Sequence, residues 1–298
     1  MLRFPPALRP GDLIAVIAPS GPLPWVPFWS GLAWMRQRYR LRISSDMNRR
    51  AGYLAGDDAR RASELVDALH DPDVKAIAAG RGGYGAMRVL ESHTLEALSL
   101  TPRWLVGFSD ITALHVAASA HGVASIHGPN VSGLAKASAF DRWAWLTALE
   151  RPEAPVVWEG LEWLHPGVPE RRVSGPVCGG NLSVLEAMAS AGRLVLPPGG
   201  VLMLEDVDER PYRVDRMLTS LRLGGHLARL SAIVFGGFTR CATGPDGVTI
   251  EAVLIDRTKD LGVPILSGAP FGHGAANQSF VLGRTAVVEG GRVRFPVL

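Results

Sequence analysis

The sequence predicts an α/β protein: an N-terminal domain with a parallel sheet of the flavodoxin or Rossmann type, then a C-terminal mixed α/β domain with a β-rich end. Three observations lead to this prediction. Short, continuously apolar runs, typical of strands buried on both faces, alternate with segments of helical periodicity. The pattern breaks between residues 136 and 172. The end of the chain holds two short apolar segments separated by Gly290 and Gly291.

The N-terminal elements begin with the run Leu-Ile-Ala-Val-Ile-Ala from residue 13, which stops at Pro19-Ser20-Gly21-Pro22 and predicts a first strand. The elements expected next are a helix over 57–70, a strand over 74–79, a short helix over 86–91, a strand over 104–107, a helix over 111–120 and a short strand near 124–126. Because strands alternate with helices, we expect functional residues in loops at the carboxyl ends of the strands.

The middle of the chain, residues 136–172, is rich in Trp, Pro and Glu and has no clear periodicity. We expect it to be a linker with some structure of its own between an N-terminal domain, 1–135, and a C-terminal domain, 173–298. Elements expected in the second domain are a helix over 182–189, a strand over 200–204, a helix over 212–223, a strand over 232–236 and a terminal hairpin of 286–289 with 293–295.

The composition excludes several classes of protein. Of the 298 residues, 47% are hydrophobic and 20% charged, which is enough to bury a large core. The 31 basic and 28 acidic residues are spread along the chain, so a nucleic-acid partner is not expected. No apolar run approaches the roughly 20 residues that span a bilayer, so no membrane partner is expected either. The start lacks a signal-peptide pattern, and Cys178 and Cys241 have no metal-ligand spacing; both observations favour a cytoplasmic protein.

A glycine-rich loop, Gly80-Arg81-Gly82-Gly83-Tyr84-Gly85, satisfies G-x-G-x-x-G, follows a strand and precedes a helix. Dinucleotide binding would place this loop after the first strand of its domain, whereas here a strand and a helix come before it. The acid nearest the expected place, Asp110, lies beyond a further strand. Two other interpretations stay open: a purely structural turn, and a set of backbone N–H groups that forms an anion or oxyanion site in a hydrolase.

Ser109 stands between an apolar strand and a helix, directly after Gly107-Phe108. A sharp strand-to-helix turn there could expose its hydroxyl at the edge of the sheet as a nucleophile. The alternative is that Ser109 or Asp110 caps the following helix. Cys178, among glycines, is a second candidate nucleophile, although a lone cysteine is more often a small core residue.

The best candidate base for a serine nucleophile is His273, which is flanked by glycines, and its competitor is His127 at the end of a strand. Such a base needs a carboxylate that fixes its tautomer. Glu205 closes the apolar strand 201–204 and is placed like a catalytic residue, whereas we expect the acids that follow it, at 206, 208 and 209, to lie in a solvated loop. A metal site of these acids with His273 is an alternative that no zinc-ligand spacing supports.

Taken together, five segments of the chain resemble the LD-carboxypeptidase family of serine peptidases, which includes the murein tetrapeptide carboxypeptidases and the microcin C immunity peptidases. The segments are 9–20, 79–85, 107–114, 204–206 with 211–217, and 272–274. The resemblance extends from about residue 9 to 284. Phe108 and Asn130 stand where Tyr and Met are common in the family.

The resemblance implies a Ser109, Glu205, His273 triad, with an oxyanion hole of backbone N–H groups from Asp110 and from Gly82 or Gly83. It implies a homodimer without a cofactor that cleaves an amide bond after an L-centre, typically releasing D-alanine from the tetrapeptide of recycled cell wall.

Further alternatives concern the ligand. The first is an immunity-type peptidase that accepts an aminoacyl-sulfamoyl-nucleotide and stacks its base on Trp143 or Trp145. A non-catalytic peptide-binding module and a nucleotide-binding oxidoreductase are more distant. We expect Arg81 to bind the substrate carboxylate, because a guanidinium can do so bidentately; a structural salt bridge is its alternative role.

Overall fold

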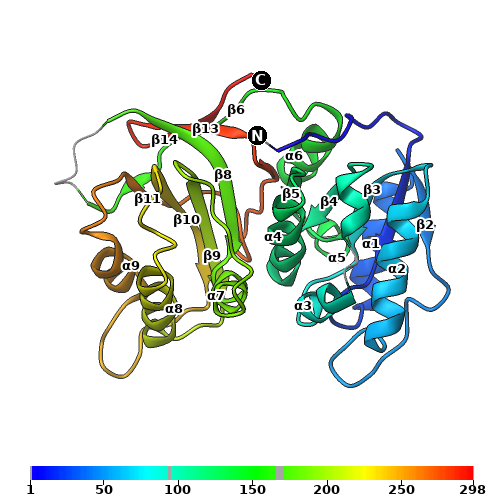
Figure 1. Ribbon diagram of the computed structural model, residues 1–298, viewed down its shortest axis with the longest axis horizontal. Helices are drawn as coiled ribbons and strands as arrows, with labels where there is room; N and C mark the ends of the chain where they lie inside the picture. Colours follow the sequence, from blue (N-terminus) through cyan, green and yellow to red (C-terminus); the bar gives the residue numbers. More distant parts are fainter. Residues whose placement is uncertain (1, 93–94, 166–170, 298) are drawn as a thin grey trace. The chain divides into compact units, whose positions relative to one another are not determined.

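The computed structural model describes residues 2–92, 95–165 and 171–297, and the chain forms two compact units (Figure 1). Unit 1 comprises Met1–Pro152 and Gln278–Gly283; unit 2 comprises Glu153–Asn277 and Arg284–Leu298. Each unit is an α/β body with its own sheet, which confirms the predicted fold class. The domain limits expected from the sequence stay a prediction.

The sheet of unit 1 has the order β12-β5-β4-β3-β1-β2, and its pairs are parallel except for β12, which is antiparallel to β5. Its strands are β1 (Leu13–Ile17), β2 (Arg40–Ile43), β3 (Val74–Ala79), β4 (Trp104–Gly107), β5 (Ser125–His127) and β12 (Phe280–Leu282). The predicted strands are confirmed. β2 was not predicted, because its alternating Arg-Leu-Arg-Ile belongs to a half-exposed edge strand and not to a buried run.

Two groups of helices accompany this sheet (Figure 1). α1 packs against α5, whereas α3 contacts both α2 and α4. The helical segments are α1 (Trp25–Met35), α2 (Asp58–His70), α3 (Ala86–Val89), α4 (Thr112–Ala120), α5 (Val131–Leu134) and α6 (Ala139–Glu150), with short 3-10 segments η1 (Leu90–Ser92), η2 (Glu96–Ser99) and η3 (Ser109–Ile111).

α6 lies within the segment 136–172, where the sequence shows no clear periodicity. The side chain of Ser138 caps it, and its Trp145 is fully buried against Trp34 and Tyr39. Phe140 and Trp143 of the same helix are exposed. Aromatic residues on both its buried and its exposed side hide the helical period of this segment.

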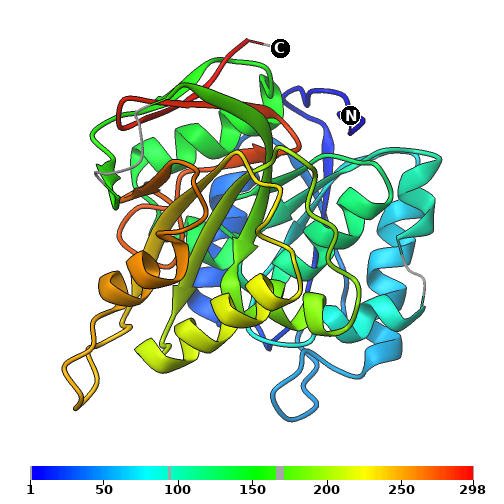
Figure 2. The ribbon, with the colours of Figure 1, turned by 60° about the vertical axis from the view of Figure 1, so that its left-hand side comes forward.

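The sheet of unit 2 has the order β6-β14-β13-β8-β9-β10-β11-β7. Its long strand β8 (Val173–Asn181) pairs antiparallel with β13 through residues 173–176 and parallel with β9 through residues 177–181, and it curves along the sheet in Figure 2. The other elements are β6 (Val156–Trp158), β7 (Glu162–Trp163), α7 (Leu182–Ser190), β9 (Val201–Val207), α8 (Pro211–Leu223), β10 (Ala232–Thr239), α9 (Ile250–Thr258), β11 (Ile265–Ser267), β13 (Thr285–Glu289) and β14 (Arg292–Phe295).

The terminal hairpin prediction is confirmed, because β13 and β14 pair antiparallel through Val288 and Val293. β8 to β11 run parallel, so their carboxyl ends share one edge of the sheet, and Asn181 and Glu205 stand in register near it. Among the helices of residues 2–92, 95–165 and 171–297, none is long and apolar enough to cross a membrane.

Candidate active site

Ser109 lies at a strained turn in unit 1. β4 ends at Gly107, Phe108 is extended, and Ser109 has a φ of 65°. A side chain other than glycine in this left-handed region costs about 1–3 kcal/mol, and such strain is concentrated at functional sites. Ser109 is only half-buried. The turn therefore carries a serine whose side chain is not sealed in the core.

Two side chains hold the backbone just before this serine. The N–H of Phe108 donates to Oδ1 of Asn130 at 3.2 Å. Nε2 of His115 donates to the carbonyl oxygen of Gly107 at 2.9 Å, and its Nδ1 lies 2.9 Å from Oγ of Ser125. Burial lowers the pKa of His115 to about 4, so this ring is neutral at physiological pH. His115, which is 2% exposed, therefore packs in the fold and holds the carbonyl oxygen of Gly107.

The helix-capping alternative for Ser109 and Asp110 stays a prediction. The residues directly before η3 and α4 are Phe108 and Ile111, and neither side chain makes a cap hydrogen bond. The carboxylate of Asp110 instead accepts a hydrogen bond from the N–H of Ala86 at 2.8 Å. Asp110 is only 5% exposed, and burial raises its pKa.

The glycine loop lies directly against the nucleophile candidate. A Cβ on Gly82 would stand 3.0 Å from Cβ of Ser109 and 3.2 Å from its Oγ. Gly83 and Gly85 have φ angles of 114° and 127°, which only glycine adopts readily. The loop can therefore bring backbone N–H groups close to Ser109, as an oxyanion site requires.

Arg81 of the same loop is exposed, and its Nη1 donates to the carbonyl oxygen of Pro22 at 2.8 Å. No carboxylate in residues 2–92, 95–165 and 171–297 forms an ion pair with it. The structural salt bridge considered for Arg81 is thus not present in the part of the chain described.

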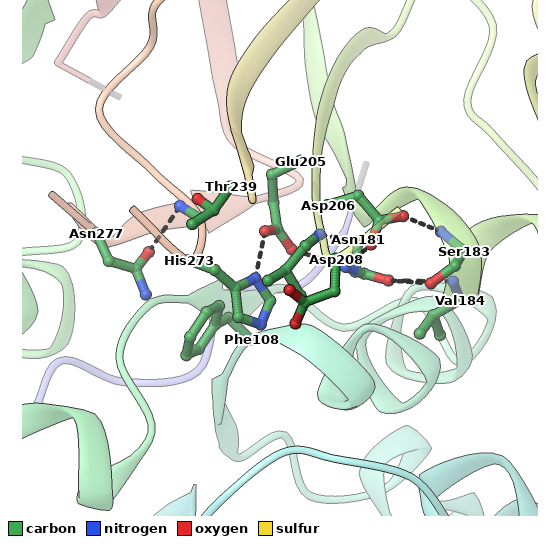
Figure 3. Close-up of polar contacts among 12 residues, drawn as sticks. Phe108, Asn181, Ser183, Val184, Glu205, Asp206, Asp208, Thr239, His273 and Asn277 are labelled. Carbon is green, nitrogen blue, oxygen red and sulfur yellow. Dashed lines mark hydrogen bonds and ion pairs between the residues drawn. The ribbon is translucent and has the colours of Figure 1, made fainter. Parts of the chain in front are cut away.

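Glu205 and His273 meet in unit 2 (Figure 3). Glu205 on β9 is fully buried, and its Oε2 accepts a hydrogen bond from Nδ1 of His273 at 2.7 Å. A proton held on Nδ1 leaves Nε2 as the basic nitrogen of the ring. Gly272 has a φ of 115°, and a Cβ there would lie 2.9 Å from Oε2 of Glu205. A glycine before His273 is what allows the loop to approach this carboxylate.

Sequence reasoning missed two residues that support this pair. Nδ2 of Asn181 donates to Oε1 of Glu205 at 3.2 Å and to Oδ1 of Asp206 at 3.0 Å (Figure 3). Asp206 is 2% exposed and accepts hydrogen bonds from the N–H groups of Ser183 and Val207. Burial, together with the neighbouring Glu205 carboxylate, raises the pKa of Asp206 to about 6.

The prediction of a solvated loop is therefore wrong for Asp206. β9 continues to Val207, and the carboxylate of Asp206 is buried inside unit 2. The expectation fits Asp208, which is exposed and paired with Arg240. Glu209 is half-buried and lies near Arg213. The signal that could have found Asn181 is its place at the end of a glycine-rich strand that aligns with β9.

The other candidate groups have structural settings. His127 is fully buried on β5, and its ring stacks on Phe280 at a centroid distance of 4.7 Å, which fits packing better than general-base catalysis. Burial raises the pKa of the Cys178 thiol to about 12, which disfavours the thiolate that nucleophilic attack needs. Among the described residues, no group of three or more His, Cys, Asp or Glu side chains could hold a metal ion.

A serine at a strained strand-to-helix turn and a buried carboxylate–imidazole pair are the groups that serine hydrolases use. The chain belongs to the LD-carboxypeptidase family. Residues 14–128 match the LD-carboxypeptidase N-terminal domain, and residues 174–288 match the LD-carboxypeptidase C-terminal domain. The family resemblance seen in the sequence is confirmed.

Named relatives cover most of the chain. The murein tetrapeptide carboxypeptidase of Pseudomonas aeruginosa is 38% identical over 82% of this chain and 81% of its own. The probable murein peptide carboxypeptidase of Bacillus subtilis is 30% identical over 96% and 94%. The dinucleotide-binding oxidoreductase interpretation gains no support from these relatives.

Solved structures show the same fold. The muramoyltetrapeptide carboxypeptidase from Oxalobacter formigenes has a TM-score of 0.83 at 29% identity, covering 95% of this chain and 97% of its own. The microcin C7 self immunity protein has a TM-score of 0.86 over 99% of this chain and 98% of its own, but at 21% identity this likeness concerns the fold alone.

Proposed function

We propose that this chain is a serine-type LD-carboxypeptidase that hydrolyses an L,D amide bond and releases D-alanine from a murein tetrapeptide in cell-wall recycling. The observation that carries the proposal is the fully buried Glu205 carboxylate 2.7 Å from Nδ1 of His273. The relatives that are named murein tetrapeptide and murein peptide carboxypeptidases support the substrate.

In the proposed mechanism, Oγ of Ser109 attacks the scissile carbonyl carbon while Nε2 of His273 takes the hydroxyl proton. Glu205 stabilises the imidazolium that forms and keeps the proton on Nδ1. The tetrahedral intermediate collapses as the C–N bond breaks, and His273 gives its proton to the amine of the leaving D-alanine. Water then hydrolyses the acyl-enzyme by the same route. The proposal requires Oγ of Ser109 to reach Nε2 of His273 in the working enzyme.

The oxyanion would accept hydrogen bonds from the backbone N–H of Asp110 and from that of Gly82 or Gly83. The close approach of Gly82 to Ser109 supports this assignment. Arg81, exposed and without a carboxylate partner among the described residues, is proposed to bind the substrate carboxylate. None of these steps calls for a cofactor.

The test is turnover of L-Ala-γ-D-Glu-diaminopimelyl-D-Ala, followed by release of D-alanine. Ser109→Ala should lower kcat by about 10⁴-fold or more, whereas Ser119→Ala on α4 serves as a matched control that should leave it unchanged. A Ser109→Ala protein that turns over the tetrapeptide at nearly the wild-type rate would overturn the proposal.

A sulfamoyl-nucleotide substrate rests on fold likeness alone. One solved complex of the microcin C7 self immunity protein holds aspartyl sulfamoyl adenosine. Base stacking on Trp145 is excluded because this ring is fully buried, whereas Trp143 is 46% exposed and touches Phe140. Assaying the tetrapeptide and aspartyl sulfamoyl adenosine side by side separates the two substrates by their kcat/KM.

The quaternary state and location complete the proposal: a homodimer in the cytoplasm. Cys178 and Cys241 are both free thiols, which fits a reducing compartment. Light scattering on the purified chain should give twice the 31.9 kDa chain mass. Cell fractionation should recover the protein with cytoplasmic markers.

A further inference from the structure

One peptide group of the glycine loop is held at both ends by buried charges. The carbonyl oxygen of Gly85 accepts a hydrogen bond from Nη1 of Arg61 at 2.7 Å. The N–H of Ala86, in the same peptide group, donates to Oδ2 of Asp110 at 2.8 Å. Arg61 is fully buried and Asp110 is 5% exposed. A buried guanidinium and a buried carboxylate therefore hydrogen-bond to the two ends of one peptide group.

Arg61 also hydrogen-bonds to a second loop. Its Nη1 also donates to the carbonyl oxygen of Pro19, just after β1, and its Nη2 pairs with Asp58. A Cβ on Gly85 would lie 2.5 Å from Nη1 of Arg61, so this position accepts the guanidinium only because it is glycine. Burying a guanidinium is costly, and Nη1 of this one donates to the backbone of two loops, those that follow β1 and β3.

Asp110 connects the same peptide group to the nucleophile turn, because it is the residue after Ser109. Its partner Ala86 opens α3, directly after the glycine loop. The loop has glycine at 80, 82, 83 and 85, which makes its backbone intrinsically mobile. Oxyanion donors are effective only when they are held in place before the charge develops.

We propose that Arg61 and the side chain of Asp110 are positioning residues that clamp the glycine loop against Ser109 and so keep the oxyanion donors preorganised. This inference rests on the proposed function, in which N–H groups of that loop bind the oxyanion. The clamp acts on the transition state more than on the bound substrate, so its loss lowers kcat while KM changes little.

The kinetic test compares Asp110→Ala with Asp110→Asn on the tetrapeptide. The alanine variant should lose about 100-fold in kcat with KM within about threefold, the scale expected for a misplaced oxyanion donor. Asp110→Asn keeps an oxygen that can accept from Ala86 N–H, so it should recover to within about tenfold of wild type. An alanine variant with kcat within threefold of wild type would overturn the clamp.

Two controls separate positioning from general stability. Asp141 is 3% exposed on α6, and Arg142 donates to the carbonyl oxygens of Leu134 and Ala135, so both resemble the clamp residues but lie on another helix. Asp141→Ala and Arg142→Met should lower Tm about as much as the clamp variants do, but they should keep the wild-type kcat. If they lose as much kcat as Asp110→Ala and Arg61→Met, stability explains the effect and the clamp is refuted.

Amide hydrogen exchange gives a readout that does not need turnover. In Asp110→Ala and Arg61→Lys, peptides spanning 80–86 should exchange faster than in wild type while those of β3 stay protected, and in Asp110→Asn, which keeps the acceptor, they should exchange more slowly than in Asp110→Ala; unchanged exchange of the loop in Asp110→Ala would overturn the clamp. An active Ser109→Ala protein would instead refute the proposed function. An inactive Ser109→Ala beside a fully active Asp110→Ala would refute the clamp alone.

Discussion

Replacing Gly82 by alanine adds one methyl group beside the proposed nucleophile. Gly82 does not have a left-handed φ, so its backbone accommodates alanine without strain. The new Cβ would stand 3.0 Å from Cβ of Ser109, 3.2 Å from its Oγ and 3.4 Å from the carbonyl oxygen of Phe108. Unstrained carbon–carbon contacts lie at about 3.5–4.0 Å, so the serine and the loop must separate by about 0.5 Å or more.

The expected size of the effect follows from this displacement. A misplacement of about 1 Å at a reacting centre costs about 100-fold in rate, so Gly82→Ala should lower kcat by about 10- to 100-fold. Overpacking of this kind costs about 1–3 kcal/mol in the free energy of unfolding, which leaves the protein folded at 25 °C. The rate should thus fall much further than the loss of stability explains.

The assay is tetrapeptide turnover beside urea unfolding, with Gly133→Ala as the matched control. Gly133 lies in α5, and a Cβ there meets only Cβ of Pro129 at 3.6 Å, an ordinary contact. Gly133→Ala should therefore keep wild-type kcat. A folded Gly82→Ala enzyme with kcat within twofold of wild type would refute the reasoning about the loop and Ser109.

Three further predictions follow from the site. Glu205→Gln removes the negative charge that stabilises the imidazolium and can present an amide N–H to Nδ1 of His273, which favours the wrong tautomer, so it should lower tetrapeptide kcat by about 10³–10⁴-fold with little change in KM; a tenfold effect or less would contradict that role. Arg81→Ala should raise KM for the tetrapeptide at least about tenfold but leave KM for a C-terminally amidated analogue unchanged, and an equal rise in KM for both substrates would argue against carboxylate binding. Burial raises the pKa of Asp206 from 3.8 to about 6, so this carboxyl binds a proton more tightly in the folded protein than in the unfolded chain. The free energy of unfolding that comes from this group therefore rises as the pH falls from about 7 to 4, by up to about 3 kcal/mol. The free energy of unfolding in urea, measured across this range for wild type and for Asp206→Asn, should show that difference between the two proteins, and parallel curves would contradict it.

The fold was predictable where buried elements show a clear pattern of apolar residues in the sequence. β3 and β4 were predicted at their observed limits, because β4 is apolar and buried throughout and β3 is apolar and buried at every position except Lys75. The antiparallel strand β12 was not predicted, since Phe280–Leu282 leaves unit 2 and pairs with β5 more than 150 residues earlier in the chain. The sequence of three apolar residues does not indicate which of the two sheets the strand joins.

The candidate site was predictable one residue at a time but not as a network. Glu205 stood out because an acid closes an apolar strand, and His273 because glycines flank it. Their contact spans 68 positions, and it was predicted because a histidine base needs a carboxylate that fixes its tautomer, a pairing that the family resemblance also implied. Asn181 and Asp206 were missed because their role depends on the register of β8 with β9, which places Asn181 beside Glu205.

The most direct test of the central claim is to trap the acyl-enzyme. Wild-type protein is mixed with the tetrapeptide, quenched in acid within milliseconds and digested, and the peptide that contains Ser109 is examined by mass spectrometry. We predict an added mass equal to the acyl group left after loss of D-alanine, located on Ser109 and missing from Ser109→Ala. An adduct on Cys178, or turnover by Ser109→Ala without any adduct, would contradict the account.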